Sequence, residues 1–466
     1  MAIQNLLLKI MMEQLNNKSG IEKSFIAVSL LILFVGMCFG LTGALQYILP
    51  GFLKSSLSFE KVRPLHVSSV VFWIIFGAMG TVLSYLQEHG AKKKYSASLI
   101  KLQFVIFVCT LIAILISYLT GNFGGREYWE FPPYLSIPIV AGWILFIINF
   151  IRSVKSFKKQ PVYFWMWITG LVFFLFTFIE SYLWLLPFFG KDVIKDMTIQ
   201  WKSYGSMVGS WNMLLYGSGI YLMDKISKNK KYSTSGIAFS LYFLGLFNLM
   251  FNWGHHIYTL PTESYVKHLS YAVSMTELFI FGRIIYLWKS SLTEAQKNFH
   301  KDSYMFLIAA DVWVFLTLAV AIFMSVPAFN VYTHGTHITV AHTMGATIGI
   351  NTMLLMAFAH DLIIGTGVKY QTKTIKFGFW LANISLFIFW ISLLGAGVSK
   401  AIWQFSANQT SFSIMMKNLQ PYFKVFFVSG LFLAGGLSAI CFSILKFYLK
   451  NSIAEFRIKF SRLSTN

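Results

Sequence analysis

Three histidines gather at the start of one long apolar segment, within residues 333–345. They are His334, His337 and His342, three of the ten histidines in the chain, and Met344 follows two positions later. On a helix that turns roughly 100° per residue, the side chains of His342 and Met344 point about 200° apart. Such a helix offers one ligand to each of two cofactors on its opposite sides. The simpler alternative is that these rings hydrogen-bond inside a helical bundle, because unpaired polar groups are costly there.

A second pair of histidines, His255 and His256, ends another apolar segment. Imidazole suits iron, copper and zinc alike, and two adjacent histidines on a distorted helix end reach one metal ion. Trp253 and Gly254 directly before them offer a packed wall and room for the backbone. The pair predicts a metal site, and the alternative is an interfacial polar pair beside Tyr258.

A short polar segment, residues 124–132, carries Arg126, Glu127 and Glu130 between two apolar runs. Carboxylates of this kind suit a hard cation such as calcium. An arginine beside them suits the propionates of a haem. The segment therefore predicts a calcium ion or a propionate contact.

Glu277 lies inside an apolar run, where an ionisable residue is a functional candidate by default. Glu180 and Asp311 are weaker functional candidates for the same reason, because they are also ionisable residues in apolar runs. Hydrogen bonding within a helical bundle explains each of these residues equally well.

The composition of the chain indicates a membrane protein with many spans. Of 466 residues, 56% are hydrophobic, 18% are aromatic and only 12% are charged. No soluble domain of this size has such a composition. The net charge of +21 comes from short loops, so membrane orientation explains it better than nucleic-acid binding. The three cysteines lie far apart and predict neither a disulfide nor a metal cluster.

Apolar runs of about 20 residues predict twelve membrane-spanning helices in an all-α bundle. The predicted spans are 24–49, 65–87, 99–120, 134–151, 162–188, 203–223, 235–257, 266–288, 304–327, 337–364, 377–398 and 422–449. No soluble segment interrupts them, so we expect a single membrane domain over 1–466, with short terminal segments 1–23 and 450–466.

The loops on one side hold more than twice as many lysines and arginines as those on the other. The positive side is expected to be cytoplasmic, which puts both termini inside. The histidines near residues 66, 255 and 342 then share one layer close to the outer face. A shared depth is what cofactors held between helices require.

Taken together, these features resemble the haem–copper oxidase superfamily, and within it the large subunits of bacterial nitric oxide reductases. The resemblance covers nearly the whole chain. It rests on the twelve spans, Arg63-Pro64-Leu65-His66, the loop from Arg126 to Glu130, the pair His255-His256, Glu277, and His334-Gly335-Thr336 leading to His342. The Arg-Pro-Leu-His sequence is closer to C-type oxidases, which are near relatives.

The resemblance implies two haems, which we expect to be b-type. His342 matches the proximal ligand of the high-spin haem. His66 matches one ligand of the low-spin haem, and Met344 stands where the family has a second histidine. Methionine–histidine ligation is a workable haem site with a raised reduction potential. The alternative second ligand is His337, two turns before Met344. Arg126, His334 and His337 are expected near the propionates.

The resemblance also implies a non-haem metal beside the high-spin haem, held in the family by three histidines and a glutamate. His255 and His256 match two of these ligands. The sixth span departs from the family pattern, because Tyr204 or Gly205 stands in place of the third histidine and Val208 in place of the glutamate. Two histidines alone make a weak iron site. Tyr204, Glu277 or water completes the site, or the metal, iron or copper, is bound differently or is absent.

The function implied is the reduction of nitric oxide, in which two NO, two electrons and two protons give nitrous oxide and water. Glu277 is a candidate for proton delivery, and Tyr204 a second candidate catalytic residue. No path of ionisable residues leads in from the cytoplasmic side, which favours proton uptake from outside. One rival is oxygen reduction or NO dismutation on the same scaffold. Another is a haem-only electron-transfer or sensing subunit, and a transporter without haem is the least favoured.

The resemblance further implies a bacterial cytoplasmic membrane and a partner. A separate small subunit of cytochrome c type is expected to supply the electrons, because the chain has no cytochrome domain of its own. We expect no nucleic-acid partner.

Overall fold

The computed structural model describes residues 20–89, 95–365, 368–407 and 409–463. Glu277 lies in a described helix, but its side chain is outside the described residues. In the described part the chain is helical, and its one β-type contact is an isolated bridge between Arg126 and Trp129.

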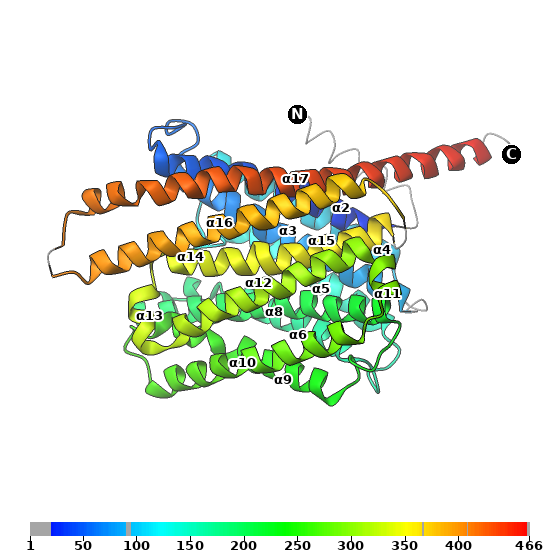
Figure 1. Cartoon of the computed structure of the whole chain (residues 1–466), viewed down its shortest axis with the longest axis horizontal. Coiled ribbons are helices and arrows are strands. Elements are labelled where there is room, and N and C mark those ends of the chain that lie inside the picture. The colour runs from blue at the N-terminus through cyan, green and yellow to red at the C-terminus, as the bar shows by residue number, and fades with distance from the viewer. Residues whose placement is uncertain (1–19, 90–94, 366–367, 408, 464–466) are drawn as a thin grey trace.

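Long helices lie side by side along one common direction (Figure 1). The first half of the chain forms α2 (Ile21–Ile48), α3 (Phe59–Glu88), α4 (Ala97–Leu119), α5 (Ser136–Ser153), α6 (Val162–Glu180) and α8 (Val193–Ser227). The second half forms α9 (Gly236–Phe251), the 3₁₀ segment η3 (Asn252–Ile257), α10 (Ser264–Ser291), α12 (Lys301–Ser325), α16 (Thr372–Gln404) and α17 (Phe412–Leu463). Short helices between these are η1 (Pro133–Leu135), η2 (Leu183–Leu185), α7 (Pro187–Gly190), α11 (Glu294–Phe299) and α13 (Pro327–Thr333).

The predicted tenth span is one helical rod built from four consecutive segments. It comprises α14 (His337–Met344), the π-helical η4 (Gly345–Thr352), α15 (Met353–Ala359) and the π-helical η5 (His360–Ile364). π-Helical segments are rare and are found frequently at functional sites. Here η4 starts directly after the two ligand candidates His342 and Met344.

Ten helical segments of the described part are long and apolar enough to cross a membrane. The predicted spans 203–223 and 266–288 are not among the ten, although α8 and α10 run through them. The reason lies in their composition, because serine, glycine and charged residues lower the hydropathy of both helices. Much of α8 is buried in the bundle, where polar side chains find partners.

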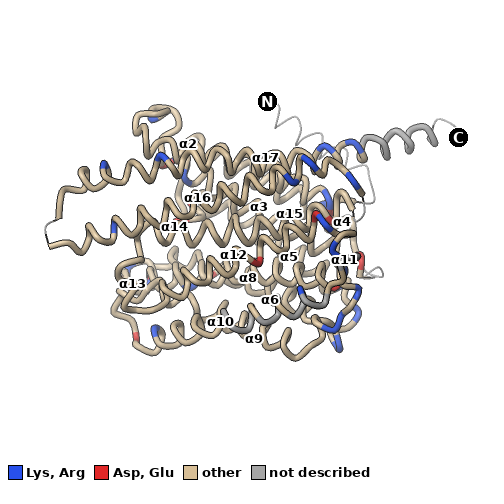
Figure 2. Tube along the Cα trace, in the orientation of Figure 1, with Lys and Arg blue, Asp and Glu red and all other residues tan. Residues whose placement is uncertain are grey.

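Basic residues gather at the end of the bundle from which α17 projects (Figure 2). The start of α2 and the end of α17 therefore lie on the more positive side. The candidate ligands near residues 66, 255 and 342 belong to the helix halves that point toward the opposite end.

Candidate functional site

His66 on α3 is held in one orientation by the neighbouring helix α2. Its Nδ1 donates a hydrogen bond to the carbonyl oxygen of Gly36 at 2.7 Å. A Cβ added at Gly40 would lie 2.8 Å from the imidazole ring, so only glycine leaves room for it. Because a carbonyl only accepts, Nδ1 carries the proton, and the lone pair of Nε2 is left for a ligand. This is how haem-ligating and metal-ligating histidines are commonly oriented.

His337 and Met344 lie on the same side of the tenth rod but at different depths. The ring of His337 contacts Tyr47 of α2 and Phe423 of α17, at centroid distances of 6.5 Å and 5.3 Å. Tyr47 stands seven residues beyond Gly40, or roughly 10 Å along α2. Met344 lies seven residues below His337, which is the same distance back into the bundle. Met344 therefore reaches the depth of His66, whereas His337 lies about two turns above it.

The other side of the rod faces a cluster of aromatic and histidine rings. His255 and His256 on η3 lie 4.2 Å apart, measured between ring centroids. Trp201 of α8 stacks on His256 at 4.5 Å with an interplanar angle of 9°, and His334 lies 6.0 Å from His256. His342 is close enough to interact electrostatically with both members of the pair. Burial lowers the pKa of His334, which favours a neutral ring in this cluster.

The α8 residues that replace the expected metal ligands do not face this cluster. The ring of Tyr204 packs against Tyr128, with ring centroids 5.4 Å apart, and Val208 is 39% exposed. The expectation that Tyr204 completes the metal site is therefore not supported. Its side chain turns toward the 124–132 loop because it is one position away from the face that contacts η3.

That face of α8 is closed by direct helix contact. A Cβ added at Gly205 would lie 2.7 Å from the Cβ of Trp253, and one at Gly209 would lie 3.0 Å from the backbone of Leu249. Among the residues with described side chains, no three His, Cys, Asp or Glu come together as a metal site. The two histidines present thus do not by themselves fit a non-haem metal. The side chain of Glu277 is outside this test.

The outer loop is tied to α3 and α8 by ion pairs. Arg63 pairs with both Glu127 and Glu130, the latter at 3.2 Å. Arg126, expected near a propionate, instead pairs with Asp196 of α8 at 2.5 Å and lies over the ring of Trp184. These contacts fold the polar segment back onto the bundle.

One carboxylate oxygen of Glu130 in this loop lacks a hydrogen-bond partner among the described residues. This atom, Oε2, is buried. Burial also raises the pKa of the Glu130 carboxyl group. A hard cation fits this orphaned oxygen and the nearby Glu127, although Arg63 already supplies one positive charge there.

Comparisons with known proteins agree with this architecture. A family model described as "Cytochrome C and Quinol oxidase polypeptide I" matches residues 20–432. The chain belongs to this family. Family members are oxidoreductases of the bacterial membrane that bind haems and a second metal.

Individual relatives come from two branches of the family. Over 445 residues the chain is 25% identical to a nitric oxide reductase subunit of Stutzerimonas stutzeri, with 89% of this chain and 92% of the relative covered. It is 22% identical to cytochrome c oxidase subunit 1 of Rhodobacter capsulatus, with 83% and 76% covered. The structure of a haem–copper terminal oxidase dimer has the same fold, with a TM-score of 0.72 at 17% identity, covering 92% of this chain and 84% of that one.

Sequence reasoning missed several residues that shape this oxidase-family site. The glycines that seat His66 are spaced four apart, as Gly36 and Gly40, and a Gly-x-x-x-Gly pattern in an apolar helix is a readable signal for close packing. Gly205 and Gly209 repeat that signal on α8. Trp201 carries no such signal, because its stacking on His256 depends on a helix distant in sequence.

Proposed function

We propose that this chain is the large subunit of a membrane nitric oxide reductase, which converts two NO, two electrons and two protons into nitrous oxide and water. The observation that carries the proposal is that the helix of the predicted tenth span presents candidate ligands on two opposite sides. His342 faces the His255–His256 pair, while Met344 lies at the depth of His66 on the other side. The extent of the match to the nitric oxide reductase of Stutzerimonas stutzeri supports it further.

In this proposal the chain holds two b-type haems, which supply electron transfer and a binding position for NO. His66 and Met344 would hold the low-spin haem, and His342 would supply the protein ligand of the high-spin haem. The Gly36 carbonyl keeps Nε2 of His66 free for the iron. His334 and His337 are the proposed residues of the propionate region, whereas Arg126 is already paired with Asp196.

His255 and His256, with Trp201 stacked on His256, would flank the high-spin haem on the side of η3. The flat contact of Trp201 on His256 shields this wall and fixes the ring orientation. A non-haem iron or copper on the two histidines requires further donors, of which Glu277 is our candidate. Glu277 is also our candidate for delivering protons.

Several finer features belong to the same proposal. Both termini are proposed to face the cytoplasm, because the start of α2 and the end of α17 lie toward the basic end of the bundle. A separate subunit of cytochrome c type delivers electrons from the outer side. A calcium ion at Glu127 and Glu130 is part of the proposal, supported by the orphaned oxygen of Glu130.

A second candidate function is a haem-only electron-transfer or NO-sensing subunit. It is favoured by one observation, the close contact of Gly205 with η3, because Gly205 is one of the two positions at which the resemblance predicts the third histidine ligand. A third candidate, oxygen reduction or NO dismutation, is favoured by the relatives among cytochrome c oxidases.

One experiment separates these candidates. Iron, copper, calcium and haem are measured per purified chain, and EPR spectra are recorded for the oxidised and reduced forms. Two haems and one further iron, with NO consumption, are expected for the reductase. Copper in place of that iron, with oxygen consumption, would shift the assignment to the oxidases. Haem iron alone would contradict both catalytic functions and support the haem-only subunit.

A further inference from the structure

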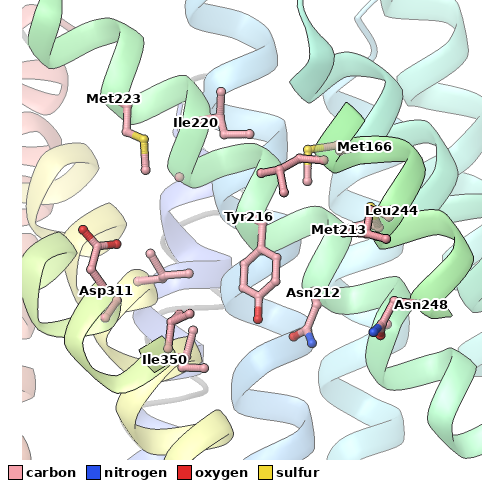
Figure 3. A pocket seen from close by; sticks show the side chains of 17 residues that line it. Met166, Asn212, Met213, Tyr216, Ile220, Met223, Leu244, Asn248, Asp311 and Ile350 are labelled. Carbon is pink, nitrogen blue, oxygen red and sulfur yellow. The ribbon is translucent and has the colours of Figure 1, made fainter. Parts of the chain in front are cut away.

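A cavity of about 120 Å³ lies between α6, α8, α9, α12 and the tenth rod (Figure 3). Its lining follows α8 at every third or fourth position from Gly209 to Met223. Fourteen residues of helix correspond to roughly 21 Å, so the cavity extends along much of the bundle's depth. It has room for several water molecules.

The lining is mostly apolar but has a polar group at its middle. Figure 3 shows Asp311 of α12 on one wall, Asn212 and Asn248 toward the other, and the Tyr216 side chain between them. Asp311 is only 9% exposed, and its Oδ2 has no hydrogen-bond partner among the described residues. A lone carboxylate in an apolar interior is far more costly than a carboxylic acid or a hydrated group. Asp311 therefore needs a proton or water from the cavity.

The outer end of the cavity lies toward the layer of candidate ligands near residues 66, 255 and 342. Asn351 of η4 donates a hydrogen bond to Oδ1 of Asn212 at 3.2 Å, while its own Oδ1 is buried without a partner in the described chain. Asn351 stands seven residues after Met344 on the same rod. Gly209, at this end of the lining, packs against Leu249, and Gly205 one turn farther toward the outer face packs against Trp253.

The other end of the cavity lies next to a charged network on the basic side of the bundle. Met223 in the lining is two residues from Lys225, which pairs with Asp361 at 2.8 Å and with Glu88 at 3.1 Å. The Asp361 side chain is fully buried and accepts a hydrogen bond from Tyr85 at 3.3 Å. These charged groups lie near the depth of this end of the cavity, because Lys225 is only roughly 3 Å along α8 from Met223.

We propose that Asp311 is a proton-carrying residue that takes up protons through water in this cavity from the basic end and passes them toward Asn212 and Asn351. The carboxylic acid loses its proton to a neighbouring water, and the resulting carboxylate takes a new proton from hydronium. Among the described side chains, the titratable or charged groups facing Asp311 are Tyr216 on the cavity wall and Lys289 of α10, whose charge acts on Asp311 from farther away. This route differs from the expectation that proton uptake from outside is favoured.

Infrared spectroscopy of the full chain, transferred from H₂O to D₂O, tests the uptake step without turnover. We expect a carboxylic acid C=O band that shifts on deuteration and is lost in Asp311→Asn. The matched control is Glu180→Gln, whose carboxylate pairs with Lys202 at the outer end of α6, and the band should persist in it. A band that is unchanged in Asp311→Asn would overturn the proposal.

Filling the cavity tests the route. Gly219 lines the cavity, and a Cβ there meets only Leu354, at 3.7 Å, so Gly219→Leu fits and occupies the space. We expect the rate at which the Asp311 band shifts in D₂O to fall on the order of a hundredfold, which is the size of effect seen when a positioned proton carrier is lost. Gly435→Leu, at a position with nothing within 4 Å, is the control and should leave the rate unchanged. Equal rates in both variants would overturn the cavity as the route. Ala310→Leu is the substitute where Gly219→Leu does not fold.

The role in turnover rests on the proposed function and is measured separately. In proteoliposomes with a trapped pH indicator, Asp311→Asn should lower NO turnover and internal proton uptake together while NO still binds the reduced chain. Full turnover with normal uptake in Asp311→Asn would overturn the role of Asp311. A wild-type chain that does not consume NO would contradict the proposed function and leave the infrared result intact.

Discussion

The hydrogen bond from His66 to the Gly36 carbonyl shows how one residue is prepared for ligation before any cofactor binds. The bond selects the tautomer, and Gly40 provides the space in which the ring lies. Methionine is the partner that matches His66 in depth. The proposed low-spin site thus combines an oriented imidazole with a thioether that carries no proton.

Substitutions on the tenth rod distinguish the two possible ligands. Met344→Ala should abolish the low-spin haem spectrum, whereas His337→Ala should leave it unchanged, because His337 lies about two turns above His66. Met344→His should keep the low-spin spectrum and lower the reduction potential, since methionine ligation raises it. Optical spectra and a redox titration measure both effects. Loss of the low-spin spectrum in His337→Ala alone would reverse the assignment.

Glu130 predicts a pH dependence of the outer loop. Burial raises its folded-state pKa above the ordinary value, so the folded loop binds this proton more tightly than the unfolded loop. The stabilisation is present below the ordinary pKa and is lost as pH rises through the raised pKa. Hydrogen exchange of residues 121–132, corrected for intrinsic rates, should therefore increase over that interval in the wild type. Glu130→Gln should flatten the dependence, and Glu127→Gln is the matched comparison; an unchanged profile in Glu130→Gln would contradict it.

At the scale of elements, α8 determines what lies beside the histidine pair. Gly205 and Gly209 bring it into close contact with η3 and α9, and Gly205 is one of the two positions at which the resemblance predicts the third histidine ligand. The same helix turns Tyr204 toward Tyr128 and supplies Trp201 to His256. The same helix thus packs closely against η3 through its glycines and supplies the tryptophan that stacks on His256.

Gly205→Ala tests this close contact. The added methyl group would lie 2.7 Å from the Cβ of Trp253, which requires α8 and η3 to move apart. We expect a loss of about 1–3 kcal/mol in stability, measured by thermal unfolding in detergent. Gly236→Ala, with nothing within 4 Å, should be neutral. Equal melting temperatures for the two variants would show that the contact between α8 and η3 is looser than described.

For the whole molecule, the distribution of lysines and arginines predicts the orientation in the membrane. Lysines and arginines are concentrated at the end from which α17 projects (Figure 2). The opposite end carries the ligand layer and the 124–132 loop. A donor of electrons on the outer side would therefore approach the proposed low-spin site without crossing the bilayer.

Reporter fusions test this orientation. A fluorescent protein fused after Asn466 should fluoresce, and a phosphatase fused after Ser406, between α16 and α17, should be active, because basic loops stay in the cytoplasm. A fusion after Asn229, in the basic loop between α8 and α9, serves as the inside control. Phosphatase activity at Asn229 or at the C-terminus would contradict the proposed topology.

The order of spans, the all-α class and the identity of the candidate ligands follow from the sequence alone, because apolar runs and histidine spacing are local properties. The family membership expected from those motifs is confirmed by the family model. Boundaries extended beyond the apolar runs, as in α8, because helices continue into the polar layers.

Only the tertiary structure decided which ligand candidates share a depth and which partners the charged residues take. Met344 and His337 are equivalent on a helical wheel, and their difference appears only against Tyr47 and Gly40 of α2. Arg63, and not Arg126, holds Glu127 and Glu130. The cavity at Asp311 likewise exists only where five helices meet. Distances between segments far apart in sequence depend on packing, which local patterns do not encode.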